Sequence, residues 1–328
     1  MKKVTMMVII GIMVIITNLN AEIITVDINF PFQGNYKTLQ EAHDAAEPGD
    51  TIYIYPSLSK HKGCNISKQL KIIGAGYGYD YADDGVYTTK ILTMAFSEGS
   101  EGSEFKGFHA VETITIRANN ITIKSNYCKM ISIDNGYTGI IITQNEIYGS
   151  TPIYVNSNNQ VTITNNIIIN NLNLSHNCIS VGIYCSVLIK NNILHGKMTC
   201  NNDSNGMFIN NISTGGVVFC QNFEFYNNMG NSNQFSSLTG SNNIGNINMN
   251  DVFVDYSANN YQLKDDSLAK GVGTSGDDLG VYGGSSPFVP NGALTGIPSI
   301  NYLKPENVII QPGAESMTVK IKANSGSE

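Results

Sequence analysis

The chain has 328 residues, of which 41% are hydrophobic, enough for a sizeable core in one large domain or two ordinary ones. Only 14% of the residues are charged and the formal net charge is −7. The chain therefore lacks the basic field that nucleic-acid binding through phosphates requires, and we expect no nucleic-acid partner.

Residues 1–21 have the pattern of a secretory signal peptide. The stretch MKKVTMMVIIGIMVIITNLNA begins with two lysines, continues with an apolar run from Val4 to Ile16 and ends in a short polar stretch at Ala21. The alternative is an uncleaved anchor, although the apolar run is short for a bilayer span of about 20 residues. We expect bacterial export, a secreted or cell-envelope location and no membrane span after cleavage.

A helix followed by a strand is predicted next. In YKTLQEAHDAAEPGDTIYIYP, Tyr36–Pro56, the residues Leu39, Ala42 and Ala46 fall on one side of a helix. Pro48-Gly49-Asp50 ends that helix, and TIYIY has the alternation of a strand.

The stretch YGYDYADDGVY, Tyr77–Tyr87, places Asp80, Asp83 and Asp84 among four tyrosines. Carboxylates alternating with aromatic rings can bind Ca²⁺ through oxygen ligands or stack on sugar rings. The spacing does not match an EF-hand, and the alternative is a solvated loop. We keep the three aspartates as calcium candidates, and Ca²⁺ as the one cofactor that the sequence suggests.

The central part of the chain repeats one short segment six times. Each copy ends in an asparagine, at intervals of 17 to 26 residues: Asn126, Asn145, Asn166, Asn192, Asn211 and Asn228. Three positions earlier stands a large apolar residue: Ile123, Ile142, Ile163, Ile189, Phe208 and Phe225. Two positions earlier stand Lys124, Thr143, Thr164, Lys190, Ile209 and Tyr226. Five positions earlier every residue is apolar except Gly206.

This repeat predicts one strand stacked many times. Alternate side chains of a strand point to opposite faces, so the apolar positions face a core and the column from Lys124 to Tyr226 faces solvent. A period near 20 residues without helical periodicity is typical of a solenoid. An asparagine in the turn tolerates the left-handed backbone region, and its amide can bond the asparagines one coil above and below. We expect a structural ladder, and the alternative is a set of asparagines that hold a sugar or an ion.

A last patterned segment, Asp251–Gly284, reads DVFVDYSANNYQLKDDSLAKGVGTSGDDLGVYGG. It contains F-x-D, N-Y-x-L, S-x-A and D-x-G-x-Y-G-G in that order. With the helical segment and the repeat, it makes the chain resemble the right-handed parallel β-helix proteins of the pectate-lyase-like superfamily, over roughly Asn35–Gly284. The resemblance implies an all-β, single-stranded right-handed parallel β-helix over 22–290. Its N-terminal helix would cap the open end, and Asp251–Gly284 would form a closing coil.

The tail, residues 291–328, changes in composition. Two β-rich pieces, NVII and MTVKIKA, predict a short strand-forming tail after a linker. Capping the final coil is the default role, because an uncovered coil would aggregate. Docking onto the β-helix or joining a partner are the alternatives.

Six cysteines form neither a CxxC pair nor a Cys/His cluster, so zinc has little support. They are Cys64, Cys128, Cys178, Cys185, Cys200 and Cys220. Export permits oxidation of these cysteines, and the alternative is buried free thiols that act as small apolar residues.

The resemblance implies a choice between two chemistries. Lyases of this superfamily use a Lys or Arg base with carboxylates that hold Ca²⁺, and hydrolases on the fold use clustered aspartates. Between 118 and 250 the chain has only four acids, Asp134, Glu146, Asp203 and Glu224, and none share an offset in neighbouring coils. The repeat therefore argues against a carboxylate cluster of the family type.

The candidate catalytic residues are Arg117, Lys124, Lys190 and His195, with His176 as a further acid/base candidate. Arg117, the only arginine, is expected near Lys124 around one corner of the coil. The alternative is that these cations are simply solvated. Convergence of three or more of them with an acid would support an enzyme.

Thr143, Thr164 and Tyr226 are the candidate substrate-binding residues, on a flat surface that suits an extended polysaccharide or cell-surface glycan. One functional hypothesis is therefore a secreted carbohydrate-active protein, a polysaccharide lyase cutting by β-elimination or a relative that only binds glycan. The other is a non-catalytic structural or adhesive surface protein. We expect a monomer in either case.

Overall fold

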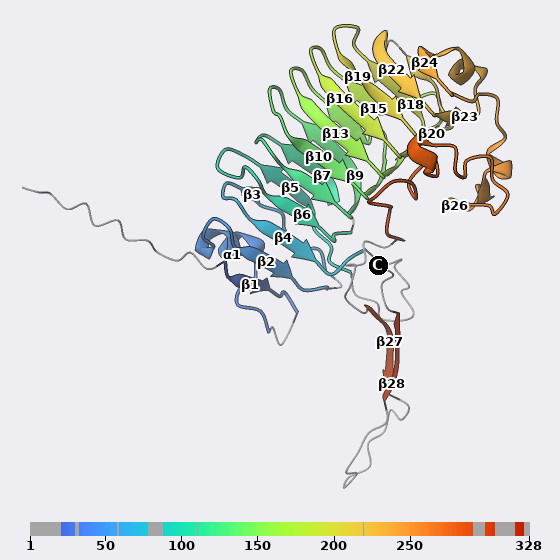
Figure 1. The fold of residues 1–328 in the computed structure, drawn as a ribbon. Helices are drawn as coiled ribbons and strands as arrows, with labels where there is room; N and C mark the ends of the chain where they lie inside the picture. The colour runs from blue at the N-terminus through green and yellow to red at the C-terminus, as the bar shows by residue number, and fades with distance from the viewer. Residues whose placement is uncertain are drawn as a thin grey trace, which may run out of the picture.

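The computed structural model describes residues 21–29, 33–57, 59–77, 88–109, 111–218, 220–290, 299–305 and 319–324. Short strands dominate these residues, and most of them stack in parallel into two long sheets (Figure 1). The expected parallel β-helix is confirmed. The expected signal peptide, residues 1–21, lies almost entirely outside the described residues, as do Asp80, Asp83 and Asp84.

The first face of the β-helix is a parallel sheet of eleven strands. In spatial order they are β1 (Ile23–Val26), β2 (Thr51–Ile54), β4 (Lys71–Gly74), β6 (Glu104–Lys106), β8 (Thr122–Lys124), β10 (Ile140–Thr143), β13 (Gln160–Thr164), β16 (Ser186–Lys190), β19 (Asn205–Ile209), β22 (Asn222–Tyr226) and β24 (Gly240–Ser241).

The other parallel sheet has thirteen strands and divides at β9 (Tyr127–Ile133). Before β9 come β3 (Asn65–Ile66), β5 (Thr93–Phe96) and β7 (Val111–Ile116). After it, the second face consists of β11 (Glu146–Gly149), β14 (Ile167–Asn170), β17 (Ile193–His195), β20 (Ile212–Ser213) and β23 (Met229–Gly230). The third face consists of β12 (Ile153–Val155), β15 (Asn177–Val181), β18 (Lys197–Cys200) and β21 (Val217–Val218).

The register confirms the columns read from the sequence. Ile142 pairs with Ile123 in one neighbouring coil and with Ile163 in the other. Such inward residues are buried along the whole stack and form one continuous core. Gly206 is the exception, because a Cβ there would lie 2.1 Å from the carbonyl oxygen of Val187 in the preceding coil and 2.7 Å from Cε1 of Phe223 in the next.

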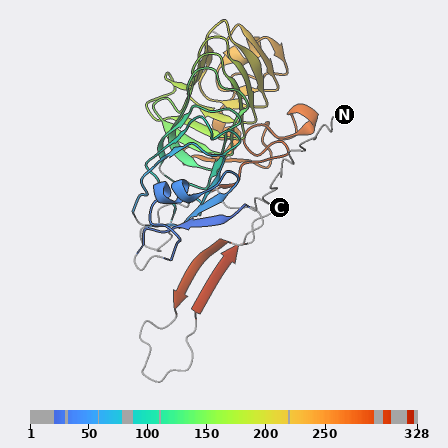
Figure 2. The same ribbon diagram turned by 90° about the vertical axis from the view of Figure 1, so that its left-hand side faces the viewer.

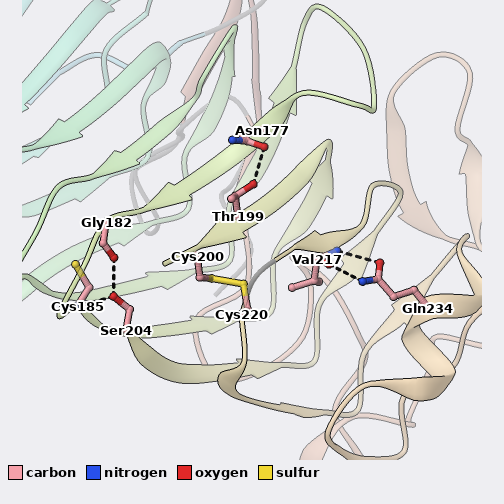
Figure 3. Close-up of a disulfide and its surroundings, with 9 residues drawn as sticks. All are labelled: Asn177, Gly182, Cys185, Thr199, Cys200, Ser204, Val217, Cys220 and Gln234. Atoms are coloured by element: carbon pink, nitrogen blue, oxygen red, sulfur yellow. Dashed lines mark hydrogen bonds between the residues drawn. A yellow bond between two sulfur atoms is a disulfide. The ribbon is translucent and has the colours of Figure 1, made fainter. Parts of the chain in front are cut away.

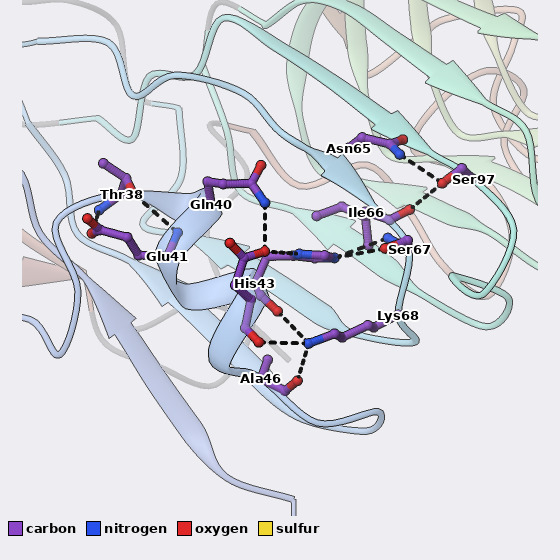
Figure 4. A network of polar contacts seen from close by, with 11 residues as sticks. Thr38, Gln40, Glu41, His43, Ala46, Asn65, Ile66, Ser67, Lys68 and Ser97 are labelled. Carbon is purple, nitrogen blue, oxygen red and sulfur yellow. Dashed lines mark hydrogen bonds and ion pairs between the residues drawn. The ribbon is translucent and has the colours of Figure 1, made fainter.

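The N-terminal end is covered by the predicted helix, α1 (Leu39–Ala45). Thr38 and Glu41 form a capping box at its start, and Leu39 and Ala42 are buried in the core. At its end, Lys68 Nζ donates to three backbone carbonyls, one of them of Ala46 at 2.7 Å (Figure 4). Strand β1 precedes α1 and adds one rung that the sequence analysis did not identify.

The C-terminal end of the stack is closed by η1 (Asn233–Ser237). Phe235 is fully buried in the core there, and the Gln234 side chain bonds the backbone N–H and C=O of Val217 (Figure 3). This amide takes the place of one further strand beside β21.

The segment that follows does not form the closing coil that the resemblance implied. Residues 249–288, here called the strap, contain η2 (Met249–Asp251), the antiparallel pair β25 (Phe253–Asp255) and β26 (Asn260–Leu263), and η3 (Thr274–Gly276). The strap runs back along the outside of the β-helix, from the end of the stack towards its middle (Figure 1). It buries apolar side chains that point outwards from the second face, and so builds a second core.

The described strands of the tail, β27 (Ser299–Pro305) and β28 (Val319–Asn324), pair with each other in a separate antiparallel sheet (Figure 2). MTVKIKA overlaps β28, as predicted, whereas NVII lies outside the described residues. In the described part of the chain, no helix has the length and apolarity that crossing a membrane requires.

Candidate functional site

The six asparagines of the repeat are joined in one buried column. Each Nδ2 donates to the Oδ1 of the next asparagine at 3.0 to 3.2 Å, from Asn126 through to Asn228. The column continues for one rung that the sequence analysis missed, Asn243, which accepts from Asn228 at 2.9 Å. Each Nδ2 from Asn126 to Asn211 also donates to the carbonyl two residues earlier. The six asparagines from Asn126 to Asn228 have no exposed surface. Their amides bond the backbone and each other, and are not available to a ligand.

The left-handed residue of each turn is the one before the ladder asparagine, not the ladder asparagine as expected. Its φ is 53° at Ser125 and Asn165, with similar values in the other coils. From Gln144 to Asn227 the side chains of these left-handed residues bond the strap. Asn165, for example, donates to the carbonyls of Val281 at 3.0 Å and Gly283 at 2.8 Å. Asn191 bonds the same Gly283 carbonyl. In NN pairs, the first asparagine therefore holds the strap and the second holds the coil.

The solvent-facing column of the first face is continuous and in register. Thr143 pairs with Lys124 on one side and Thr164 on the other, and Thr164 pairs with Lys190. The hydroxyl of Thr164 donates to that of Thr143 at 3.1 Å. The two lysines are three strand steps apart, so their backbones are separated by about 14 Å. The side-chain ammonium group of neither lysine has an ion-pair or hydrogen-bond partner among the described residues.

The first face is positive although the chain as a whole is negative. Its outward positions from β2 to β22 carry four lysines, Lys71, Lys106, Lys124 and Lys190, against two glutamates, Glu104 and Glu224. Both glutamates are already engaged: Glu104 with Lys106 at 3.1 Å, and Glu224 with the Tyr226 hydroxyl at 2.9 Å. The face is therefore a net cationic strip with hydroxyls between its free ammonium groups.

The other catalytic candidates do not join this strip. Arg117 makes a 2.7 Å ion pair with Asp134 in the next coil instead of approaching Lys124. His176 lies in an exposed loop and bonds Asn173 at 2.8 Å. His195 is on the second face, where its Nδ1 bonds the Tyr256 hydroxyl at 3.1 Å. Each of these three candidates is bonded to a partner of its own, Arg117 and His176 at exposed positions and His195 beneath the strap.

A cluster that sequence reasoning missed surrounds Glu146, at the start of β11. Burial raises the pKa of the Glu146 carboxyl to about 7. Tyr261 of the strap is buried, and the nearby Tyr256, Glu146 and Tyr148 add to the effect of burial in raising the pKa of its hydroxyl. Burial also lowers the pKa of His195. The only sequence signal was an acid at a position where the following coils have Ile or Met.

Two further expectations concern metals and cysteines. Among the described residues, no three His, Cys, Asp or Glu side chains come together as metal ligands.

Cys200 and Cys220 form a disulfide that links β18 to the chain after β21 (Figure 3). The other four cysteines are buried free thiols, so each of the two interpretations holds for part of the set.

No protein-family model matches this chain, and no curated protein sequence matches it either. Its fold is that of a parallel β-helix.

Proposed function

We propose that this chain is an exported β-helix protein, related to the pectate-lyase-like superfamily, that binds an extended acidic polysaccharide without cleaving it. The observation that carries the proposal is the pair of unpartnered lysines, Lys124 and Lys190, with two threonine hydroxyls in register between them. Ammonium groups bind carboxylates by charge-assisted hydrogen bonds, and hydroxyls bond sugar hydroxyls.

Flatness and charge support an extended polyanion over a small ligand. Small molecules bind in concave sites, whereas a parallel sheet offers equally spaced groups along a line. The strip is net positive on a protein of net charge −7, so a polyanion would be steered to this face. Export is supported by the N-terminal sequence and by the Cys200–Cys220 disulfide, since disulfides persist in oxidising compartments.

Binding without cleavage is favoured because the acid/base candidates are separated. Arg117 is paired with Asp134. His195 lies on β17, under the strap, in the sheet that does not contain the strip. Elimination requires a base and a charge-stabilising group on the same substrate unit. The lysines of the strip alone provide binding.

The test is a binding assay on the mature protein with acidic and neutral polysaccharides, with and without Ca²⁺, while absorbance from unsaturated ends is recorded. Lys124→Gln and Lys190→Gln should each weaken binding to an acidic polymer roughly tenfold, the effect of losing one charge-assisted contact of about 1.4 kcal/mol. Lys197→Gln, on the third face, is the matched control and should bind normally.

Raising salt should weaken wild-type binding, because the contacts are exposed. Appearance of unsaturated ends would overturn the non-catalytic part of the proposal. Absence of binding to every polymer would refute it and leave the structural or adhesive role.

A further inference from the structure

The cap helix α1 meets the chain just after β3 through a buried histidine (Figure 4). His43 is 5% exposed, and its Nε2 lies 3.2 Å from the backbone nitrogen of Ser67 and 3.4 Å from the Ser67 hydroxyl. Its Nδ1 lies 3.2 Å from Asp44 Oδ1. A serine hydroxyl, an imidazole and a carboxylate are therefore joined in the order in which nucleophilic triads use them.

The two neighbours of the imidazole determine where its proton sits. The backbone N–H of Ser67 can only donate, so Nε2 accepts. The Asp44 carboxylate can only accept, so Nδ1 carries the proton and donates to it. This tautomer is the one that a general base requires, because the lone pair of Nε2 faces the residue whose hydroxyl proton it would take.

Asp44 is held in place although its side chain is exposed. Gln40, one turn earlier on α1, donates from Nε2 to Asp44 Oδ1 at 2.7 Å. The hydrogen bond from His43, followed by that from Gln40, lowers the pKa of the Asp44 carboxyl, so it is ionised at neutral pH. Lys68 Nζ, which bonds the carbonyls of His43 and Asp44, adds a smaller effect in the same direction. The third member is thus a charged and oriented carboxylate.

Ser67 combines a fixed backbone with an accessible side chain. The preceding carbonyl, of Ile66, accepts from the Ser97 amide of the next coil at 2.9 Å. Gly99 lies so close that a Cβ there would be 2.4 Å from the Ser67 carbonyl oxygen. Ser67 itself is exposed, and among the described residues its hydroxyl has no hydrogen-bond partner other than His43. A solute can therefore reach this serine from solvent.

A purely structural role accounts for only part of this contact. Attaching α1 to the turn after β3 requires one acceptor for a backbone N–H, which every residue type but proline supplies. Neither the hydroxyl nor the carboxylate behind the imidazole is needed for that purpose. Their convergence on one ring is what a nucleophilic site needs.

We propose that Ser67, His43 and Asp44 form a nucleophilic site that accepts the acyl group of small activated esters. The Ser67 hydroxyl oxygen attacks the ester carbonyl carbon, and its proton passes to His43 Nε2. The leaving alcohol takes that proton as the ester C–O bond breaks. Water then attacks the acyl-serine and gives a proton to Nε2, which returns it to Ser67 Oγ as the carboxylic acid leaves.

The exposure of the site defines its substrates and its electrostatics. An exposed serine stabilises a leaving group little, so the substrates are esters whose alcohol leaves readily, such as aryl esters. When Nε2 takes the proton, the Ser67 N–H loses its acceptor and can donate to the oxygen on which negative charge develops. Asp44 is a positioning residue, because it orients the imidazole without contacting the ester.

This inference is independent of polysaccharide binding. Ser67 follows β3 of the thirteen-stranded sheet, whereas the cationic strip lies on the eleven-stranded sheet. Either proposal can therefore fail without affecting the other.

Labelling of the full mature chain with a fluorophosphonate tests the site. This probe phosphonylates a serine that an imidazole activates, with loss of fluoride, and peptide mapping identifies the labelled residue. Wild type should take up a label on Ser67, and Ser67→Ala should take up none. Hydrolysis of para-nitrophenyl acetate should be roughly 100-fold faster with wild type than with Ser67→Ala, the lower end of what a positioned general base contributes.

His43→Gln separates the chemistry from the attachment of α1. A glutamine oxygen can accept from the Ser67 N–H but cannot act as a base, so labelling should fall roughly 100-fold at a similar Tm. Asp44→Asn should slow labelling at unchanged Tm, which a structural role alone would not do. Ser59→Ala removes an exposed serine whose hydroxyl has no imidazole partner among the described residues, and should be labelled as wild type.

Wild type that takes up no label, or takes it up on another serine, would overturn the proposal. Full labelling of folded His43→Gln would overturn it too, because no base would then be needed. If His43→Gln melts at a much lower temperature, the comparison of wild type with Ser67→Ala decides, since that variant keeps the backbone bond to His43.

Discussion

Substituting one rung of the asparagine ladder should destabilise the coil without affecting ligand binding, and Asn166→Leu is the sharpest case. The Asn166 amide donates to the carbonyls of Ile142 and Thr164 at 2.9 Å and to Asn192 Oδ1 at 3.0 Å. Its oxygen accepts from the backbone and side chain of Asn145 at 2.9 and 3.0 Å. Leucine has a similar size and can make none of these five bonds.

The expected loss is about 4 kcal/mol. The buried backbone N–H of Asn145 is left without an acceptor, which costs roughly 1 to 3 kcal/mol, and the remaining lost bonds contribute about 1 kcal/mol each at most. For a domain of this size, 1 kcal/mol corresponds to roughly 2 to 4 °C in Tm, so the melting temperature should fall by about 8 to 15 °C.

Thermal unfolding followed by circular dichroism measures the effect, and Thr162→Leu is the matched control. Thr162 lies on the same strand but faces outwards, so the same leucine there breaks no ladder bond. Asn243→Leu, at the partly exposed last rung, should cost less than half as much. An unchanged Tm for Asn166→Leu, or lost polysaccharide binding at normal Tm, would contradict this account of the ladder.

Four further changes test other contacts. Asn165→Gly keeps the left-handed backbone but removes both bonds to the strap, so exchange should accelerate in 279–288 and not in β13. Glu146→Gln should raise Tm above pH 7, and the gain should vanish near pH 4, where the wild-type carboxyl is protonated in both states. Replacing Cys200 and Cys220 by serine should lower stability by about 3 kcal/mol under oxidising conditions, the chain-entropy value for a loop of this length, and reductant should abolish the difference. Lys68→Met should leave the last carbonyls of α1 unbonded and lower Tm by a few degrees, with a normal Tm as the contrary result.

The positions of the residues in the cationic strip could be predicted from the sequence, but their ion pairing could not. Lys124, Thr143, Thr164 and Lys190 could be placed in one outward column from their offsets to the turn asparagines, and the register confirms that they are neighbours. The unpaired state of the two lysines could not be predicted in that way. It depends on which acids from other parts of the chain approach them.

The repeated part of this protein is determined by signals local to each strand. Buried and outward residues alternate along each strand, and the recurring asparagine marks the turn that ends it. Burial and register therefore follow from sequence offsets alone. The ladder has the same origin, because parallel stacking places the equivalent asparagines of successive coils next to each other, where their amides can bond.

The strap, the desolvation of Glu146 and the pairing of Arg117 with Asp134 were decided only by the tertiary structure. Asn165 and Val281 are 116 positions apart, and no period relates them. Whether the first asparagine of an NN pair faces water or holds a strap depends on a segment that packs from outside the repeat. The free energy of that packing comes from a second core that joins the strap to the β-helix. The sequence of neither segment by itself therefore predicts the packing.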